Sequence, residues 1–528
     1  MTGSAQLVRQ QRRSHGTTIG HVASLSPGTT SAVNELMCRR CQLRSSGHVA
    51  ITRTLRHSLV GWLPMHTALF LRSRGMRRAA PRALLFLGVA TSDVWAQESA
   101  AVPPPALTPA TPLQAVNTRP RWTEYRGRRA LHLAPLPGQE QATDQEMWAV
   151  IVGSDFTDGV IEVDVSGARR TGYATDNASA FKGFVGISFR VRGDTAERFY
   201  LRPENARLDD QLFRNRSTQY EAPPDAPWQQ LRRDAPDVYE SYADMEPGGW
   251  TQLRIEVRGR SARLFVNGAT QPALVVPELK HGVSRGAIAL WTRISADAYF
   301  SNLRILPLPT TPTTPTTPGI ASQGTAASDQ PLPAIREVVN GRVERTTFRD
   351  RPALRLVADP GKARTDEAIL AMLDGPAFVN GSIEMTVAAR PLPDAPADSR
   401  GFVGISFRTG PQAAWSEVFY VRPLNARVDD QLRRNHTVQY SSAPAFPWQR
   451  LRKESPGAYE SYADMEPSTW LALRIEVDGT RARLFVGGAS QPSLVVNDLR
   501  HGATGGQVAL WAHVETDAYF GPVTITPR

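Results

Sequence analysis

The sequence predicts an all-β protein made of two tandem antiparallel sandwiches, and two observations support this fold. The first is an internal duplication, because the segment Glu197–Leu212 recurs 220 residues later as Glu417–Leu432. When residues 197–308 are aligned with 417–528, 64 of 112 positions are identical, which indicates two copies of one structural unit. The second is hydrophobic alternation with a period of two, while no stretch of twelve or more residues shows helical spacing.

Short alternating or apolar runs mark the strands of each copy. In Leu253–Val257 the apolar residues share one face, and Ala262–Val266 repeats this pattern after a turn at Gly259, so the two runs predict a hairpin. Trp291 and Trp511 also fall within strands, where we expect core positions. Many short strands separated by Gly, Pro, Asn and Asp favour an antiparallel sandwich. Further strands are expected at 160–165, 183–190, 199–201, 274–276, 287–291 and 298–305, and again in the second copy.

The charge of the chain is confined to its first part. Residues 1–96 hold 13 arginines, no lysine and only Glu35 and Asp93 as acids, which accounts for the whole formal net charge of +11. The rest of the chain has 48 basic and 48 acidic side chains. Because a neutral body has no long-range field that steers polyanions, the sequence argues against nucleic acid as a partner.

Residues 76–96 have the layout of a signal peptide. A basic start at Met76 is followed by the apolar run Ala83–Ala90 and by Val94-Trp-Ala96, with small residues at −3 and −1 before Gln97, and the run is too short to span a bilayer. We therefore expect an exported protein, periplasmic or secreted, with no membrane span. Residues 1–75 form an Arg-rich leader that is either disordered or the result of a misassigned start.

Cysteine usage and composition divide the remainder of the chain. Cys38 and Cys41 lie in the leader without the strand–helix context of a redox motif, so the mature fold has no disulfides. Two low-complexity stretches, rich in Pro with Ala or Thr, read as extended spacers. The expected organisation is a tether at 97–112, repeat 1 at 113–308, a Pro/Thr-rich linker at 309–333 and repeat 2 at 334–528, with each repeat able to fold alone.

The order of motifs in each copy is similar to that of a known group of folds. Gly183-Phe-Val-Gly-Ile-Ser-Phe-Arg190 precedes the hairpin that begins near Trp250, and a Gly-x-x-Ala-Leu-Trp strand and the closing Ala298-Tyr-Phe300 strand follow. This order resembles concanavalin A-like jelly-roll modules, a group that includes laminin-G-like modules and the 3-keto-disaccharide hydrolase-like domain of exported bacterial proteins. The resemblance implies two jelly rolls, but that fold hosts binders and hydrolases alike. The Glu-x-Asp-x-x-Glu strand of family-16-like glucanases is absent.

The candidate ligand-binding residues come from the segment that the two copies share most closely. Aromatic faces there can stack on sugar rings, and carboxylates and arginines can bond hydroxyls. The alternative is an ordered loop pinned by Arg–Asp pairs, since ion-pair networks also occur away from sites. The candidates are Arg202, Asp209, Asp210, Trp228, Tyr239, Glu240, Tyr242 and Asp244, with Arg422, Asp429, Asp430, Trp448, Tyr459, Glu460, Tyr462 and Asp464 in the second copy.

Within this segment we expect Arg202 to hold one of the adjacent carboxylates, Asp209 or Asp210, in a two-pronged hydrogen bond, leaving the other free. A calcium site with Asn205, Asp209 and Asp210 as oxygen ligands is an alternative, although the sequence lacks a spaced-ligand motif.

Two functions remain open at this point. The first is a non-catalytic tandem module that binds a glycan or a cell-surface polymer, and duplication favours it because two linked sites raise avidity. The second is a glycoside hydrolase-like enzyme, which the carboxylates favour. No catalytic residue is assigned, and no cofactor other than calcium is considered.

Overall fold

The computed structural model describes residues 107–174, 182–308, 330–362 and 367–528. The predicted leader and signal peptide, and most of both spacers, lie outside these residues. All of these described residues belong to one compact unit. None of the helices in the described residues is long and apolar enough to cross a membrane.

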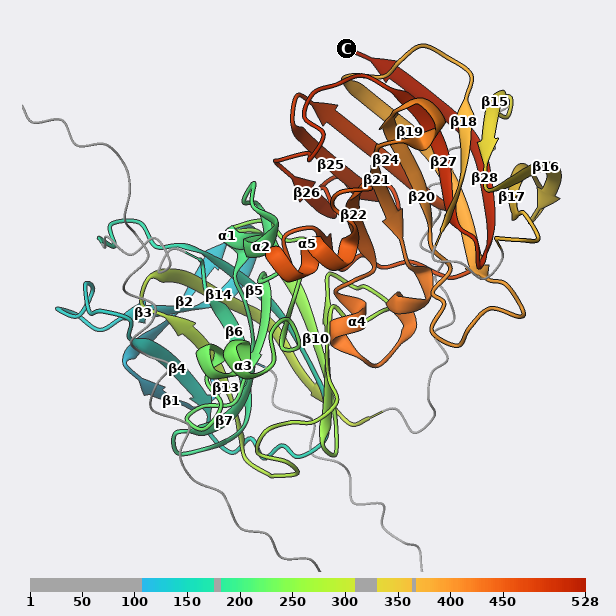
Figure 1. The fold of residues 1–528 in the computed structure, drawn as a ribbon. Coiled ribbons are helices and arrows are strands. Elements are labelled where there is room, and N and C mark those ends of the chain that lie inside the picture. The colour runs from blue at the N-terminus through green and yellow to red at the C-terminus, as the bar shows by residue number, and fades with distance from the viewer. Residues whose placement is uncertain (1–106, 175–181, 309–329, 363–366) are drawn as a thin grey trace, which may run out of the picture. The chain divides into compact units, whose positions relative to one another are not determined.

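The first sandwich consists of two seven-stranded antiparallel sheets (Figure 1). Sheet A has the order β1 (Leu113–Val116), β4 (Glu146–Ile151), β13 (Ala287–Arg293), β6 (Val185–Arg192), β7 (Thr195–Leu201), β8 (Thr218–Glu221) and β9 (Glu240–Ser241). Sheet B has the order β12 (Leu274–Val276), β11 (Ser261–Val266), β10 (Thr251–Arg258), β5 (Gly159–Arg169), β14 (Ala296–Leu306), β3 (Arg128–Pro135) and β2 (Thr118–Tyr125).

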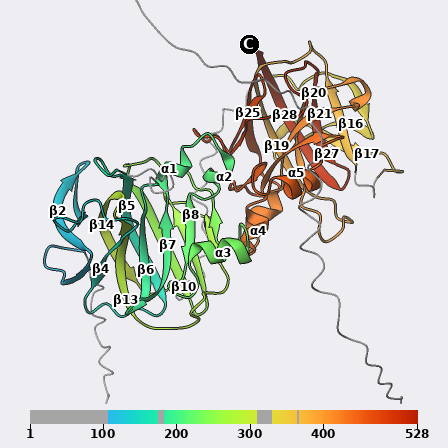
Figure 2. The same cartoon turned by 60° about the vertical axis from the view of Figure 1, so that its left-hand side comes forward.

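The second sandwich repeats this strand order. Figure 2 shows its strands in a view turned from that of Figure 1. Sheet C has the order β15 (Ile335–Val339), β18 (Ala368–Leu373), β27 (Gln507–His513), β20 (Val403–Thr409), β21 (Ser416–Val421), β22 (Val438–Ala443) and β23 (Glu460–Ser461). Sheet D has the order β16 (Gly341–Phe348), β17 (Arg351–Ala358), β28 (Thr516–Pro527), β19 (Gly381–Pro391), β24 (Leu471–Asp478), β25 (Arg481–Val486) and β26 (Leu494–Val496). The predicted all-β fold with two antiparallel jelly-roll sandwiches is confirmed.

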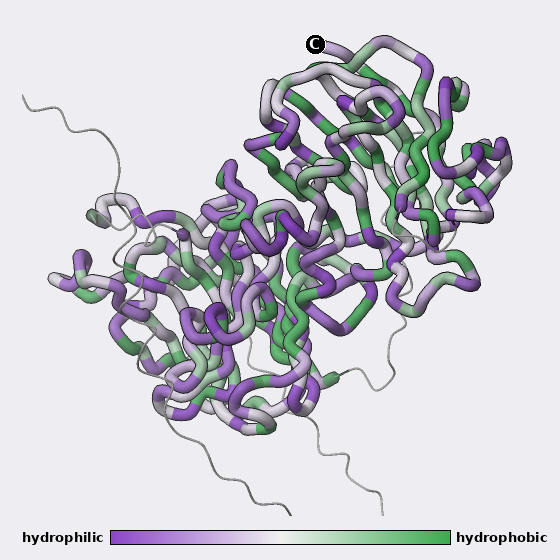
Figure 3. Tube along the Cα trace, viewed as in Figure 1, coloured by the Kyte–Doolittle hydropathy of each residue, from purple (hydrophilic) through white to green (hydrophobic). Residues whose placement is uncertain are grey.

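The alternation seen in the sequence places the core between the two sheets of each sandwich. Leu253, Ile255 and Val257 of β10 are fully buried, and the predicted hairpin is present, with Leu253 opposite Val266 in β11. The turn residue Gly259 has a φ of +56°, a conformation that costs glycine little. Figure 3 shows the hydrophobic residues following the strands inside each sandwich. The domain boundaries, and the expectation that each repeat folds alone, stay predictions.

The segment predicted to hold the site is not extended, because several short helices interrupt it. The helices are shorter than any window in which helical periodicity can be recognised, so the sequence did not indicate them. They are α1 (Pro203–Ala206), α2 (Gln211–Arg214) and α3 (Trp228–Asp234), with η3 (Pro423–Arg427), α4 (Gln431–Arg434) and α5 (Trp448–Glu454) in the second copy; η2 (Pro411–Ala413) is an additional short turn.

Candidate functional site

The predicted pairing of Arg202 with an aspartate is wrong. Arg202 is buried at the end of β7, and its guanidinium donates to the Arg216 carbonyl (2.9 Å), the Tyr200 hydroxyl (2.8 Å) and the Gln219 side-chain oxygen (3.1 Å). Arg422 makes the equivalent bonds in the second copy. Because Pro203 starts α1 directly after this residue, the chain turns away and the two aspartates never come within reach.

The two aspartates have different roles. Asp210 is the N-cap of α2, and its carboxylate accepts from the backbone N–H groups of Leu212 (3.0 Å) and Phe213 (3.3 Å). Asp209 is half-exposed and accepts from Arg483 (2.8 Å) of the other copy. One aspartate of the pair is therefore a local brace, as predicted, but its partners are backbone amides and not an arginine.

This difference predicts unequal effects of substitution. Asp210→Ala should cost about 1 kcal/mol, the usual loss when an N-cap is removed. Asp209→Ala should cost less than about 1 kcal/mol, because exposed ion pairs contribute little. Urea denaturation of the two variants measures both losses, and an Asp209→Ala variant less stable than Asp210→Ala would contradict this assignment.

The remaining candidates of this segment form a loop pinned by ion pairs. Arg232 donates to both carboxylate oxygens of Glu240, at 3.0 and 2.6 Å, and Arg207 lies 3.1 Å from Asp244. Tyr242 is buried, and burial raises its pKa to about 12 despite the nearby Arg214. Since the ring has no exposed face for a sugar, truncating Tyr242 should disturb the fold and not only binding. These residues therefore match the alternative interpretation, an ordered loop pinned by ion pairs.

The second-copy counterparts follow the same pattern with local differences. Tyr462 is buried, and Asp464 accepts from Arg427 (2.6 Å). Tyr239 and Tyr459 each pack 5.5 Å from the ring of a neighbouring tyrosine, but Tyr459 also donates to Asp498 (2.7 Å).

Glu460 predicts a dependence of stability on pH. Burial opposes its ionisation, but hydrogen bonds and charges from His436 (3.1 Å) and Arg452 (2.6 Å) outweigh burial and lower the pKa of Glu460 to about 2. A carboxyl whose pKa falls on folding stabilises the protein above its ordinary pKa of 4.5 and loses that contribution as the pH falls toward 2. The contribution should be about 3 kcal/mol at neutral pH.

Urea unfolding between about pH 6 and about pH 2 tests this. The stability difference between the wild type and Glu460→Gln should shrink as the pH falls through this window. A difference that does not change with pH would contradict the prediction.

The calcium alternative is not supported by the positions of its proposed ligands. Asn205 donates to the Arg216 carbonyl (3.3 Å), while Asp210 caps α2 and Asp209 faces Arg483. Within the ranges that the structure describes, no three His, Cys, Asp or Glu side chains converge in a way that could hold a metal ion.

Several residues that are identical in the two copies lie where the copies contact each other. The side-chain oxygen of Gln211 in α2 accepts from the backbone N–H of Val495 (2.8 Å) in β26, an edge strand of sheet D. Asn215 donates to the carbonyls of Gly457 (2.8 Å) and Glu460 (2.7 Å). The first copy therefore covers a sheet edge of the second.

The second copy returns the same contacts. Gln431 in α4 accepts from the backbone N–H of Val275 (2.7 Å) in β12, the edge strand of sheet B. Asn435 donates to the carbonyls of Asp237 and Glu240, each at 2.7 Å. Both copies must keep both halves of this arrangement, which explains why Gln211 and Asn215 recur as Gln431 and Asn435.

A different cluster, on the outer face of sheet A, has the chemistry of a binding site. Along β7, Phe199 and Leu201 face the core, so Arg198 and Tyr200 face outward. The outward residues of β4, β13, β7 and β8 meet there through cross-strand pairs such as Trp148 with Trp291 and Arg198 with Glu221. Four strands far apart in the sequence thus build one surface.

Arg198 is the centre of this cluster. Its guanidinium lies 4.5 Å from the ring centre of Trp148 and 4.3 Å from that of Trp291. It also donates to Glu221 (2.7 Å) and to both oxygens of Glu146 (3.1 Å each). Trp291 is fully buried, as expected, but it belongs to this outer cluster and not to the core between the sheets. We call these five residues the Arg198 cluster.

The exposed part of the Arg198 cluster is aromatic and acidic. Trp148 is partly exposed, and the Glu146 side chain is 30% exposed. Burial opposes ionisation of Glu146, but the charges of Arg198 and Arg293 outweigh it and lower its pKa. At neutral pH the cluster therefore presents an ionised carboxylate beside an indole.

Two of the predicted site residues, Trp228 and Arg202, border this cluster. Trp228, at the start of α3, donates its backbone N–H to Glu221 (3.2 Å) and is partly exposed. The guanidinium of Arg232 covers its ring at 4.5 Å, and that of Arg202 lies 5.7 Å away. The other candidates of the segment lie elsewhere. Trp448 and Arg452 repeat this stacking in the second copy.

The second sandwich lacks the charges of the cluster. The equivalent positions, found by strand register, hold apolar or small side chains: Val418, Ser441, Leu370 and Ala368. Sequence reasoning missed the cluster because it searched for identity between the copies. The informative signal was a difference between the copies, since Arg198, Glu146 and Glu221 are all replaced by uncharged residues in the second copy.

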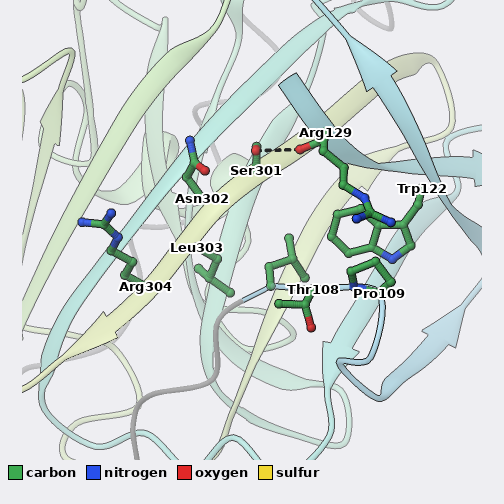
Figure 4. A pocket seen from close by; sticks show the side chains of 9 residues that line it. Thr108, Pro109, Trp122, Arg129, Ser301, Asn302, Leu303 and Arg304 are labelled. Carbon is green, nitrogen blue, oxygen red and sulfur yellow. Dashed lines mark hydrogen bonds between the residues drawn. The ribbon is translucent and has the colours of Figure 1, made fainter. Parts of the chain in front are cut away.

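A shallow pocket of about 330 Å³ lies on the first sandwich, away from this cluster (Figure 4). The Arg129 guanidinium lies 5.6 Å from the ring centre of Trp122, and the Ser301 hydroxyl donates to the Arg129 carbonyl (2.8 Å). Asn302, another lining residue, already donates to Asp164 (2.7 Å). None of the sequence-predicted site residues lines this pocket.

No family model matches the sequence, and no curated protein matches it. Solved structures with a similar fold include the carbohydrate-binding module CBM66 from Bacillus subtilis, with 12% identity and a TM-score of 0.26 over 38% of this chain and 99% of that one. Domain 4 of AbnA, an extracellular arabinanase from Geobacillus stearothermophilus, has 12% identity and a TM-score of 0.23 over 37% and 82%. Domains LG4-5 of the mouse laminin alpha1 chain have 11% identity and a TM-score of 0.18 over 78% and 94%.

Proposed function

We propose that this protein is an exported carbohydrate-binding protein without catalytic activity, and that its binding site is the Arg198 cluster of the first sandwich. The observation that carries the proposal is a guanidinium held between two indoles and two carboxylates on an outer sheet face. A partly exposed indole offers apolar surface to a sugar ring, and an ionised carboxylate forms strong hydrogen bonds to hydroxyls. The buried ion pairs hold these groups in place before the ligand arrives.

The ionic state of the cluster supports binding over hydrolysis. A glycoside hydrolase needs one carboxyl group whose pKa is raised, so that it can donate a proton to the leaving oxygen. Glu146 has a lowered pKa, and both Glu146 and Glu221 accept from the same guanidinium. Glu146 is therefore not suited to be the acid, and a screen for released reducing sugar should show no activity.

Binding should depend on Trp148 and not on its counterpart. Trp148→Ala is expected to weaken affinity by roughly ten- to a hundredfold, since stacking on an aromatic is worth about 1–3 kcal/mol. A glycan array with the mature chain identifies the sugar, and calorimetry measures the affinity. Leu370→Ala, at the same sheet position of the second sandwich, is the matched control and should leave affinity unchanged. Equal losses of affinity in both variants would show that the binding site is not the Arg198 cluster.

Export follows from the signal-like layout of residues 76–96 and is part of the same proposal. Mass spectrometry of the protein recovered from the periplasm or the medium should find a mature chain that starts at Gln97. A peptide from within residues 1–75 in that material would contradict this start.

A further inference from the structure

The contacts between the two copies are reciprocal to an unusual degree. Most bonds from one copy to the other are matched by the same bond in the opposite direction, shifted by 220 residues; the exceptions include Ser241 with Asn435 and Asn497 with Asp209. The matched side chains are Asp209 and Asp429, Gln211 and Gln431, Arg214 and Arg434, Asn215 and Asn435, and Arg263 and Arg483. We call these residues, with the edge strand of the same copy, the reciprocal surface.

Each partner of the reciprocal surface is either a side chain of the same type in both copies or a backbone group. The helix glutamine of each copy bonds the N–H of a valine, and the arginine bonds the carbonyl of a proline: Val495 and Pro492 in one direction, Val275 and Pro272 in the other. A surface that binds an equivalent of itself in this two-fold manner is isologous, and it also fits an identical copy.

We infer that the reciprocal surface is a docking surface for a second copy of this chain, and that the duplication has made the pairing intramolecular. Its core is buried in the closed chain: Gln211, Arg214 and Asn215 are 4%, 2% and 8% exposed. If the two copies separate, buried polar groups and the edges of β12 and β26 are uncovered, and exposed edges favour new pairing.

In the intact chain, pairing between the two linked copies is favoured over pairing with a second chain. A tether raises the effective concentration of the second copy to about millimolar, so the closed single chain predominates. When the contact opens, the same surface joins two chains by reciprocal exchange, at little cost in new contacts. This pairing is independent of the proposed glycan site, because the Arg198 cluster shares no residue with the reciprocal surface.

One difference between the copies predicts which like pairs form best. The side chain of Asn497 donates to the Asp209 carbonyl (2.8 Å), but Pro277 occupies the equivalent position of the first copy. A pair of two second copies would make this bond twice, and a pair of two first copies would lack it. Pairs of second copies should therefore be at least as abundant as pairs of first copies.

The test uses the full chain with a protease site in place of residues 312–318. After cleavage, native mass spectrometry should find the two halves still paired. When two batches with different mass tags are mixed, pairs of two second copies and pairs of two first copies should appear.

Asn215→Ala combined with Asn435→Ala should raise the dissociation constant of the paired halves about tenfold or more, since each substitution removes two hydrogen bonds. Arg233→Ala, an exposed residue outside the surface, should change nothing.

Halves that separate, or that pair only as one first with one second copy, would overturn the inference. If the cut halves precipitate, the intact chain provides the same answer. Two intact chains with different tags, incubated just below the unfolding transition, should form mixed dimers that the double asparagine variant abolishes. An absence of mixed dimers in the wild type would also overturn it.

Discussion

Arg198→Ala is expected to lower the free energy of unfolding by about 3–5 kcal/mol, the usual cost of breaking a buried ion pair by removing one partner. The Arg198 side chain is fully buried between two indoles, and Glu221, its closest carboxylate partner, is only 4% exposed. Without the guanidinium, Glu221 is a buried charge with no opposite charge beside it. Urea denaturation at neutral pH measures the loss.

The second sandwich supplies the matched control for this prediction. It holds valine, serine and alanine at the positions of Arg198, Glu221 and Glu146. The triple variant Arg198→Val, Glu221→Ser and Glu146→Ala should recover most of the lost stability, because apolar replacement of a complete ion-pair set is often neutral. The same variant should not bind the glycan. A triple variant as unstable as Arg198→Ala would show that packing, and not the unpaired charge, dominates.

Arg434→Ala is expected to cost about 3 kcal/mol, because a hydrogen bond to a charged group is worth about 1.5–3 kcal/mol and the losses within one network do not simply add. The guanidinium is buried where the two copies meet. It donates to the carbonyls of Ala426 (2.6 Å) and Pro272 and to the hydroxyl of Tyr462 (2.8 Å). Removing it leaves these oxygens without a donor at a buried position.

Two further variants make this prediction specific. Arg214→Ala should cost a similar amount, since Arg214 donates to Ala206 and Tyr242 of its own copy and to the Pro492 carbonyl of the second copy. Arg483→Ala should cost less than about 1 kcal/mol, because its ion pair with Asp209 is 34% and 49% exposed. Calorimetry of the full chain measures all three. Equal effects of Arg434→Ala and Arg483→Ala would contradict the importance of the buried contacts.

The strands could be predicted from the sequence because their signal is local. Alternation in Leu253–Val257 and a glycine at position 259 specify a hairpin whatever lies across the core. The short helices could not be predicted, since four to seven residues are too few to show a period of 3.6. As a result, Asp209 or Asp210 was expected beside Arg202, whereas Asp210 caps α2.

By itself, the sequence determined that this protein has two copies of an antiparallel sandwich and that its charge lies in the leader. The identity between the copies was also plain, but its meaning was not: residues such as Gln211 and Asn215 are retained because each covers the edge of the other copy. Only the tertiary structure brings Arg198 between Trp148 and Trp291, because sheet pairing joins strands that are far apart in the chain. A binding surface made of cross-strand neighbours has no local spacing, so it becomes visible only when the strands are in register.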